Sequence, residues 1–497
     1  MKILAKYAVE CEGVLANVVI YKNEGEFVKR YETTYPLLSE ATKAAIGPLK
    51  ETIVESIQNK VTDLLDPREA GIIKNKLKTK AAELVEAELG TLNEEEEKII
   101  IGRLSREMLG LGDLELLLAD EQLEEIAVNT SGENVRVYHK TFGWLTTNVT
   151  IQNEEQIHNY SSSIGRKVGK QITLLNPLMD AHLLSGNRVN ATMFPISSKG
   201  NTLTIRKFAK EPWTIVSMIE NNTLNLHLAA LLWLSIRYEM NILVSGGTAS
   251  GKTSFLNSML AFVPSDQRLL TLEDTRELQL PDFLHWTPMS TRQANPEGKG
   301  EVSLLDLLVN ALRMRPDRIV LGEIRRKREA EVLFEAMHTG HSVCATLHAE
   351  DSVQVRNRLV NPPIELPEAM LGALQLIVVQ YRQRRTGIRR TFEVSEVVPY
   401  EDTIRMNVIY RWDARKDELI QVGEHLRLIN DLTTYTGMTK KEIEEDLSGK
   451  KKVLANLVEN KIKDVNSLGR IIDQYYESPD KIFDLVDKKK NLKELLK

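Results

Sequence analysis

One short segment constrains the fold of this chain more than any other. Residues 246–253 read Gly-Gly-Thr-Ala-Ser-Gly-Lys-Thr and fit the pattern G-x-x-x-x-G-K-[S/T] at every fixed position. An apolar run at 242–244 precedes the segment, and the helical pattern SFLNSMLAFV follows it. A strand that turns through glycines into a helix points backbone N–H groups at an anion. We therefore predict a phosphate-binding loop; a chance match in a glycine-rich turn would not explain the flanking strand and helix.

The polar side chains of this loop suit a nucleoside triphosphate. Lys252 supplies a point charge for the β- and γ-phosphates, and the Thr253 hydroxyl is a ligand for Mg²⁺. ATP and Mg²⁺ are therefore the expected cofactors. The expected nucleotide-contacting residues are Gly246, Gly247, Thr248, Ala249, Ser250, Gly251, Lys252, Thr253 and Ser254.

Two acidic sites follow later strand patterns. LLTLED ends in Glu273 and Asp274, with Glu277 close by, and RIVLGE ends in Glu323. In a parallel α/β sheet the carboxyl ends of the strands face the ligand, so each strand delivers its carboxylate towards the loop. One carboxylate can hold Mg²⁺, as we expect of Glu323, and another can orient the attacking water. The alternative for each acid alone is a helix N-cap.

Histidines form a third cluster, His338, His341 and His348, in MHTGHSVCATLHAED. Their spacing resembles no usual zinc pattern, and a strand-like run separates the last two. We favour a polar sensor of the γ-phosphate at a strand end; ordinary, satisfied histidines are the alternative.

Arginines are a fourth candidate group, because hydrolysis in this class often needs a cation at the γ-phosphate. Arg188 and Arg206 precede the loop in the sequence, and the loop itself contains no arginine. The alternative for both is an ordinary surface ion pair. Further arginines flank the acids: Arg292, Arg313, Arg315 and Arg325.

The pattern along the chain indicates several domains. Short strands are expected at about 1–35 with a turn at Glu12-Gly13, and amphipathic helices from 37 to about 108, one of them starting after Asn93. From 226 onwards helices alternate with apolar strands, which argues for a parallel, helix-covered sheet. The expected divisions are 1–108, an α+β domain at 109–208, a linker at 209–225, an α/β domain at 226–425 and a helical tail at 426–497.

Composition excludes several classes of protein. The 497 residues carry a net charge of −5, which does not suggest a dedicated nucleic-acid binder. No apolar run approaches the ~18 residues of a spanning helix, and the N-terminus lacks a signal-peptide core. We therefore expect a cytoplasmic protein that meets the membrane only peripherally or through partners. The only cysteines, Cys11 and Cys344, are expected to be reduced thiols.

Four segments together resemble a known family. GGTASGKTS, TLEDTREL, LRMRPDRIVLGEIRRKREAE and AMHTGHSVCATLHAED look like the Walker A, Asp-box, Walker B and His-box motifs of the type II/IV secretion ATPase superfamily. The helical tail is similar to that of archaeal members, the archaellum motors and archaeal type IV pilus or secretion ATPases. The resemblance implies a RecA-like P-loop domain with a parallel sheet, preceded by an α+β, PAS-like N-terminal domain and a helical N-terminal region.

The resemblance also implies roles for residues. Glu273 becomes the water-activating carboxylate, Glu323 the Walker B carboxylate, and His341 and His348 the His-box residues. Arg188 and Arg206 sit where members of the family place arginines that reach a neighbouring subunit's nucleotide. Walker B here ends in Gly-Glu, which leaves the division of roles between the two glutamates open.

The partners that this family implies are a homohexamer and an integral membrane platform protein, met at the inner face of the cell membrane. No nucleic acid is expected. The helices between 37 and 108 are the expected docking surface. The machine so powered would be a type IV pilus-like filament, an archaellum or a secretion system. The four-cysteine zinc site of bacterial pilus extension ATPases is missing, which favours the archaeal or conjugation-like branch.

Two other functions remain as alternatives. A RecA-type DNA translocase or helicase would use the same core, but it should show basic, aromatic-bearing loops. Residues 282–296 carry Trp286 and Arg292 with little excess positive charge. A non-catalytic scaffold with a vestigial loop is disfavoured by the intact Lys252, Thr253, Glu273 and Glu323.

Overall fold

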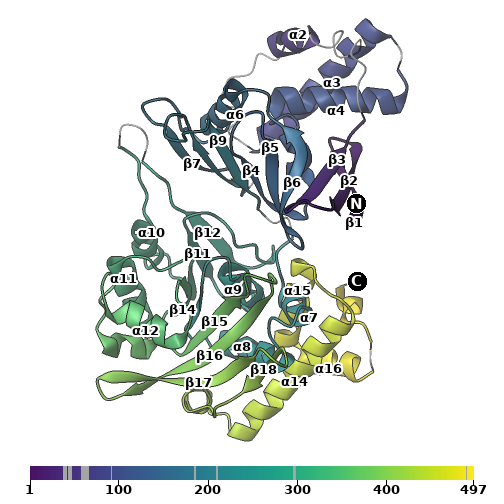
Figure 1. The fold of residues 1–497 in the computed structure, drawn as a ribbon. Coiled ribbons are helices and arrows are strands. Elements are labelled where there is room, and N and C mark those ends of the chain that lie inside the picture. Colours follow the sequence, from purple (N-terminus) through teal and green to yellow (C-terminus); the bar gives the residue numbers. More distant parts are fainter. Residues whose placement is uncertain are drawn as a thin grey trace. The chain divides into compact units, whose positions relative to one another are not determined.

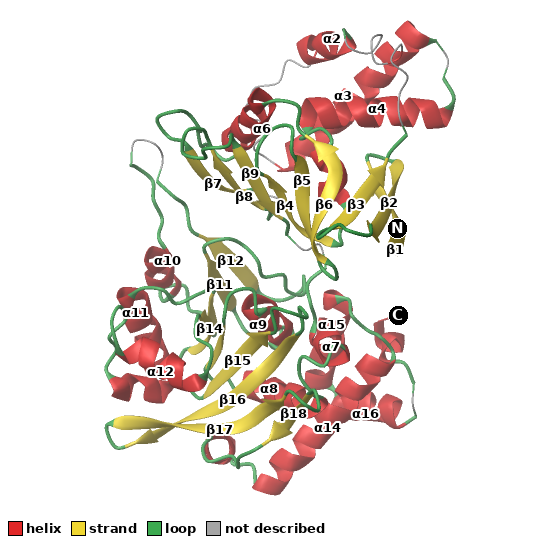
Figure 2. Ribbon diagram, in the orientation of Figure 1, coloured by secondary structure: helices red, strands yellow, loops and turns green. Residues whose placement is uncertain are grey.

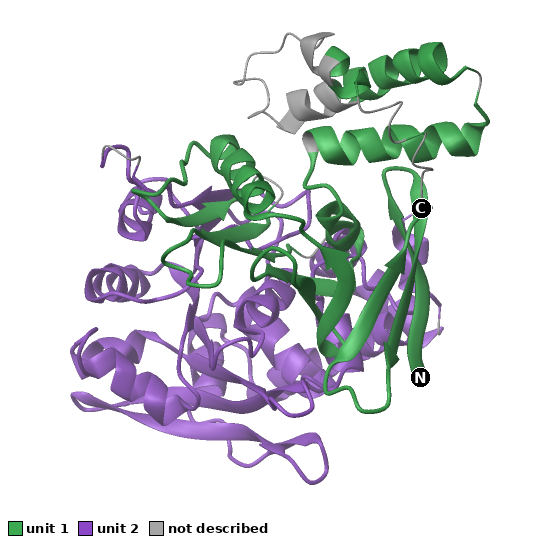
Figure 3. Cartoon of the chain, turned by 45° about the horizontal axis from the view of Figure 1, so that its top comes forward, with its two compact units in different colours: residues 1–210, 295–297 green, residues 211–294, 298–497 purple. Residues whose placement is uncertain are grey.

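Two large sheets organise the chain in the computed structural model (Figures 1 and 2). The structure describes residues 1–36, 42, 48–56, 67–90, 92–183, 186–208, 211–294, 298–488 and 490–496. The chain divides into two compact units (Figure 3): unit 1 comprises residues 1–210 and 295–297, and unit 2 comprises residues 211–294 and 298–497. No helix in the described part of the chain combines the length and the apolar character that crossing a bilayer requires.

Unit 1 is built on a mostly antiparallel sheet with the strand order β1-β2-β3-β6-β5-β4-β9-β8-β7. Its strands are β1 (Lys2–Cys11), β2 (Val14–Lys22), β3 (Lys29–Thr34), β4 (Leu123–Val128), β5 (Asn134–His139), β6 (Gly143–Thr150), β7 (Leu178–His182), β8 (Arg188–Thr192) and β9 (Thr202–Arg206). The expected turn joins β1 to β2, with φ +55° at Glu12 and +82° at Gly13, the left-handed pair that a two-residue hairpin favours.

The sheet of unit 1 runs through the boundary that we expected near residue 108. β3 pairs with β6 in parallel, although the helices α2 (Leu49–Ser56), α3 (Pro67–Leu89) and α4 (Glu94–Leu109) separate them in sequence. Apolar side chains of β1, β2 and β3 share one core with those of β4–β9, α5 (Leu114–Ala119) and α6 (Glu154–Lys167). The N-terminal strands are therefore part of the α+β domain.

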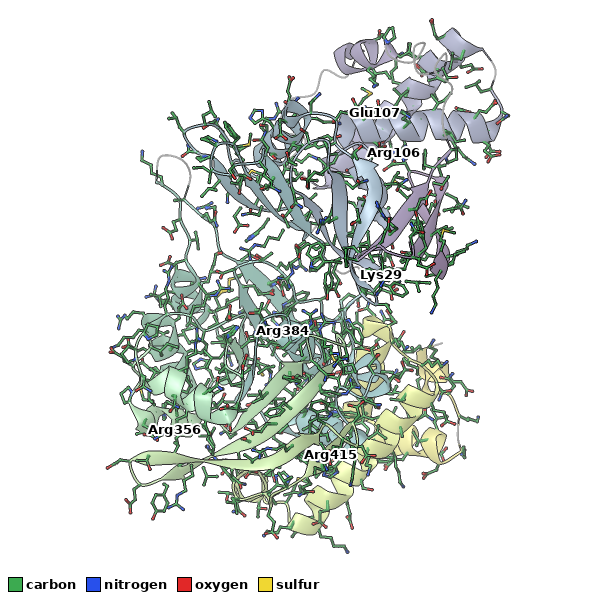
Figure 4. The ribbon with its side chains drawn as sticks, viewed as in Figure 1. Lys29, Arg106, Glu107, Arg356, Arg384 and Arg415 are labelled. Atoms are coloured by element: carbon green, nitrogen blue, oxygen red, sulfur yellow. The ribbon has the colours of Figure 1, made fainter. Side chains whose placement is uncertain are left out.

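The helices α2, α3 and α4 have a small core of their own. α4 begins with the expected Asn93 cap, whose side chain accepts from the backbone N–H of Glu96. Arg106 of α4, labelled in Figure 4, lies 3.9 Å above the ring of Tyr35 and so ties the helices to the end of the β3 segment. The remaining parts of the expected helical region, 37–41, 43–47 and 57–66, lie outside the described residues.

Unit 2 holds the parallel sheet that the alternating pattern predicted. The order is β12-β11-β13-β14-β10-β15-β16-β17-β18, parallel from β12 to β15 and antiparallel beyond. The strands are β10 (Ile242–Gly246), β11 (Leu269–Glu273), β12 (Trp286–Ser290), β13 (Arg318–Leu321), β14 (Ser342–Leu347), β15 (Leu376–Arg382), β16 (Arg389–Tyr400), β17 (Thr403–Asp413) and β18 (Glu418–Gln421).

Helices cover both faces of this sheet, which explains why its inner parallel strands β10, β11, β13 and β14 are buried along their whole length. Along β10, Ile242 and Val244 join the core on one face and Leu243 joins the core on the other. The first face carries α7 (Ile215–Glu220), α8 (Leu226–Arg237), α9 (Lys252–Leu260), α13 (Leu428–Thr436), α14 (Lys440–Glu459), α15 (Val465–Glu477), α16 (Pro479–Asp487) and the 3₁₀ helix η3 (Leu492–Leu496). The second carries α10 (Leu304–Ala311), α11 (Lys327–His338), α12 (Ser352–Val360) and η2 (Glu368–Ala373).

Most of the expected linker belongs to this second unit. Residues 209 and 210 lie outside the described residues, but α7 occupies the middle of the segment and buries Ile215, Val216 and Met218 in the core. Thr214 caps the helix by accepting from Ser217 N–H. Pro212 and the Asn221-Asn222 pair suggested a linker because they mark the ends of a short helix, which sequence alone does not separate from a loop.

Candidate functional site

The loop 246–253 leaves the carboxyl end of β10 and enters α9, as the motif predicted. Gly246 has φ +149°, and a Cβ at this residue would lie 2.3 Å from the carbonyl oxygen of Gln380 on β15. Gly251, the residue before α9, has φ +92°. Both positions therefore require glycine, and together they let the backbone curl with its N–H groups inward. Thr253 and Ser254 occupy the first turn of α9 and are half-buried.

Lys252 lies against its own loop. Its Nζ donates to the carbonyl oxygens of Gly246 and Gly247, each at 3.1 Å. Burial lowers the pKa of Lys252, while Glu323 and Glu277 oppose the shift by holding the positive charge. The ammonium is therefore held at the loop, and the charges of Glu323 and Glu277 favour its protonated form.

Glu273 ends β11 and is almost fully buried, with 3% of its surface exposed. Its Oε1 accepts hydrogen bonds from the backbone N–H groups of Glu277 at 2.8 Å and Leu278 at 3.1 Å. Burial nevertheless raises the pKa of Glu273 to about 7. Its other oxygen, Oε2, is buried without a hydrogen-bond partner among the described residues. A carboxylate with a free, buried oxygen and a pKa near neutrality suits a general base.

Glu323 lies near the end of β11, because β11 and β13 are neighbours and Leu272 is in register with Leu321. Gly322 lies against the end of β11, where a Cβ would be 3.4 Å from the carbonyl oxygen of Leu272, an ordinary contact distance. Glu323 Oε2 accepts from Arg325 at 2.7 Å, and Arg325 also pairs with Asp274. The predicted acids therefore gather at one edge of the sheet, where Arg325 bridges Glu323 and Asp274.

The two His-box residues lie at opposite ends of β14. His348 follows the strand, and its Nε2 is 3.1 Å from Thr248 Oγ1 of the loop. His341 precedes the strand, and its Nδ1 is 3.3 Å from the carbonyl oxygen of Ala336 on α11. A six-residue strand spans roughly 20 Å. The structure thus brings His348 to the loop and does not bring His341 there.

The third histidine of that segment, His338, also lies away from the loop. Its Nε2 is 3.1 Å from the carbonyl oxygen of Met370 in η2. Within the described residues, no group of three or more His, Cys, Asp or Glu side chains is arranged to hold a metal ion. Thr253 at the start of α9 and Glu323 after β13 each carry an oxygen atom of the kind that ligates Mg²⁺.

Arg188 and Arg206 belong to unit 1, where they face each other across β8 and β9. Both side chains are exposed. Arg188 makes a bidentate ion pair with Asp180, at 3.1 and 2.7 Å. Arg206 is in register with Glu125 on β4, and its charge opposes the rise that burial causes in the pKa of Glu125. The two arginines therefore form a small charged surface on one sheet face.

Arg389 at the start of β16 also touches the loop, which the sequence analysis did not anticipate. Its Nε donates to the carbonyl oxygen of Ala249 at 3.1 Å. The sequence feature that could have indicated this arginine is the arginine-rich stretch YRQRRTGIRR at 381–390, which directly follows an apolar strand. Its place beside the loop depends on the pairing of β15 with β10, and nothing in the local sequence fixes that pairing.

Comparison with known proteins adds one family and several relatives. Residues 181–391 match the family model described as type II/IV secretion system protein. An uncharacterised protein of Methanocaldococcus jannaschii is 34% identical over 383 residues, which are 75% of this chain and 69% of the relative. A putative conjugal transfer protein of Mycobacterium tuberculosis is 28% identical, over 62% of this chain and 91% of its own length. The crystal structure of the ATPase DotB from Legionella pneumophila aligns with a TM-score of 0.41 at 18% identity, covering 74% of this chain and 92% of DotB.

Proposed function

This chain belongs to the type II/IV secretion system protein family, and we propose that it is a P-loop ATPase that drives a secretion or pilus-type machine. The observation that carries the proposal is the combination at one sheet edge of the 246–253 loop, Lys252 and the buried, near-neutral Glu273. The reaction is hydrolysis of ATP to ADP and phosphate. The name of one relative supports the machine, the putative conjugal transfer protein of Mycobacterium tuberculosis.

Each residue of the site takes one part of the reaction. The backbone N–H groups of the loop and Lys252 bind the phosphates. Thr253 and Glu323 would hold Mg²⁺, directly or through water, and the ion would neutralise phosphate charge. Glu273 accepts a proton from the attacking water through its unpaired Oε2. His348 contacts Thr248 of the loop and senses the γ-phosphate. His341 lies at the far end of β14, so we assign it no direct contact with the nucleotide.

Assembly as a homohexamer completes the proposal. Arg188 and Arg206 lie on a different unit from the loop, and we propose that they reach the nucleotide of an adjacent subunit. Such a head-to-tail contact is heterologous and must close into a ring to stay finite. Within the chain Arg188 pairs with Asp180, which is the surface ion pair given above as the alternative, so reaching a neighbour would require this pair to open.

The place of action is also part of the proposal. We propose a motor in the cytoplasm that docks on an integral membrane platform protein at the inner face of the membrane. It would power a pilus-like filament, an archaellum or secretion. The separate helical core of α2–α4 is the proposed docking element, since it lies outside the catalytic motifs.

Lys252→Ala tests the assignment of the site. Without the ammonium, the chain should lose nucleotide affinity and turnover together, whereas Glu323→Gln should keep nucleotide bound and lose hydrolysis. Binding is measured with a fluorescent ATP analogue and turnover by phosphate release. Near-normal turnover in Lys252→Ala would exclude this loop as the active site. DNA binding that weakens steeply with salt, at wild-type turnover, would favour a DNA translocase instead.

A further inference from the structure

A well-formed hairpin between β15 and β16 lies beside the phosphate-binding loop. Gln380 of β15 is in register with Gly246 of β10, so the hairpin continues from the strand next to the loop. The turn is closed by two backbone hydrogen bonds, from Gln383 N–H to Ile388 O at 2.9 Å and from Gly387 N–H to Gln383 O at 2.8 Å. Arg384, labelled in Figure 4, is exposed in this turn. The first residue of the returning strand is Arg389.

Two consecutive arginines of the returning strand have different partners, as alternation along a strand requires. Arg390 is nearly buried and binds Asp417 with two hydrogen bonds of 2.6 Å each. It also donates to the carbonyl oxygen of Asn221 at 2.9 Å. Arg390 therefore fixes the strand within the unit. This fixed strand delivers the neighbouring Arg389 to the phosphate-binding loop.

Arg389 contacts the loop at Ala249, a residue with a disfavoured backbone conformation. Ala249 has φ +57°, a left-handed conformation that a Cβ disfavours. Arg389 Nε donates to the Ala249 carbonyl at 3.1 Å, and its Cδ lies 3.5 Å from where a Cβ on Gly251 would be. The arginine side chain thus runs along the loop from Gly251 to Ala249. A carbonyl held by an outside donor cannot turn inward, where it would face a phosphate.

We propose that Arg389 is a positioning residue that holds the 246–253 loop in its phosphate-binding conformation by anchoring the Ala249 carbonyl. This inference rests on the proposed function of the loop. It assigns Arg389 no contact with the reacting atoms. Its loss should therefore weaken nucleotide binding, because part of the binding energy must then close the loop. Once nucleotide is bound, the chemical step should be nearly unchanged.

The experiment compares Arg389→Gln with Arg384→Gln, an exposed arginine of the same hairpin. We expect Arg389→Gln to raise the Kd for a fluorescent ADP and the KM for ATP about tenfold, the loss typical of one hydrogen bond from a charged group. The kcat at saturating ATP should change less than about threefold. Arg384→Gln should keep the Kd for ADP, the KM for ATP and the kcat within about twofold of the wild type. Arg389→Lys keeps a cationic donor, so its Kd and KM should lie between those of the wild type and those of Arg389→Gln.

A second substitution separates this role from a general structural one. Glycine adopts the left-handed conformation without penalty, so Ala249→Gly should make the anchor less necessary. In the Ala249→Gly background, Arg389→Gln should raise the Kd by less than about threefold. The melting temperature of every variant is measured to detect general loss of stability. An equal loss in both backgrounds, or wild-type affinity in Arg389→Gln, overturns the inference alone. Failure of the wild type itself to bind nucleotide overturns the proposed function, and the inference with it.

Discussion

Glu273 lies in an environment that disfavours its charged side chain. It keeps one oxygen on two backbone N–H groups and buries the other without a partner in the described structure. Burial is the largest cause of its raised pKa of about 7. Because the unfolded chain loses this proton more readily, the raised pKa costs the folded chain stability as pH rises from about 4.5 to 7. The folded chain therefore keeps a proton-accepting group at the expense of stability.

This environment predicts a stability effect with a defined sign. The folded chain holds a proton on Glu273 at pH values where the unfolded chain has lost it, so stability falls as pH rises between about 4.5 and 7. Glu273→Gln is neutral throughout and should escape this loss. At pH 8 the variant should exceed the wild type by about 2–3 kcal/mol in unfolding free energy. At pH 4 the two should nearly coincide, and a constant difference across pH would contradict the buried, raised pKa.

Residues close in sequence to the phosphate-binding motif were predictable, whereas contacts set by strand pairing were not. The loop, Glu273 and Glu323 follow from local spacing and from the rule that parallel strands end at one edge. Arg389 reaches the site through a tertiary contact that no spacing encodes, and so does the pairing of Arg325 with Asp274. The family resemblance grouped His341 with His348, although the strand-like run between them already placed them at opposite ends of one strand.

At the scale of elements, the first three strands are part of the core of unit 1, although they lie far from the motifs in sequence. Val9, Val18, Ile20 and Tyr31 lie in the same core as β4–β9, and β3 forms an internal strand beside β6. Periodicity identified the strands but not this partnership, since the pairing spans more than a hundred residues of intervening helix and strand.

Deletion variants test that partnership. Removing residues 1–36 should unfold unit 1, because it opens the core and exposes β6 as a sheet edge. Replacing residues 48–90 with a flexible linker should leave unit 1 folded, because most of the apolar contacts of α2 and α3 lie in a separate cluster. Limited proteolysis and circular dichroism measure whether unit 1 is folded in each of the two variants. Equal tolerance of the two deletions would show that the sheet does not need its N-terminal strands.

The C-terminal helices are an integral layer of unit 2 rather than a tail. Trp233 of α8 stacks on Phe262 with ring centroids 5.2 Å apart and meets Tyr475 of α15 at 4.9 Å. Lys450 of α14 is buried beside the same rings and pairs with Asp446. Phe262 follows the helix that begins at the phosphate-binding loop. The amphipathic periods predicted these helices but not the surface that they cover.

The buried Lys450–Asp446 pair gives a quantitative test of this layer. Asp446→Ala leaves a buried ammonium without its counter-ion and should cost about 3–5 kcal/mol. Lys450→Met fills the same space with an apolar side chain and should cost less than about 1.5 kcal/mol. Urea unfolding followed by tryptophan fluorescence compares the two. A larger loss for Lys450→Met than for Asp446→Ala would refute the importance of the uncompensated charge.

At the scale of the whole molecule, the proposed ring predicts complementation between defective subunits. A Glu323→Gln subunit cannot hydrolyse in its own site but keeps Arg188 and Arg206, whereas an Arg206→Ala subunit keeps the site and lacks one arginine. Mixed rings place some intact sites beside intact arginines, so partial ATP turnover should return. Native mass spectrometry verifies that mixed rings form. No recovery in verified mixed rings, with the same result for Arg188→Ala, rules out the trans arginines.

The most direct measurement of the central claim is phosphate release from ATP by the full-length chain, with bound nucleotide quantified in the same samples. The wild type should bind and hydrolyse ATP. Glu273→Gln should keep the bound nucleotide and slow release by about a hundredfold or more, the size of a general-base effect. Lys252→Ala should lose both. Turnover within twofold of the wild type in Glu273→Gln, or undiminished turnover in Lys252→Ala, would contradict the account of this site as the ATPase centre.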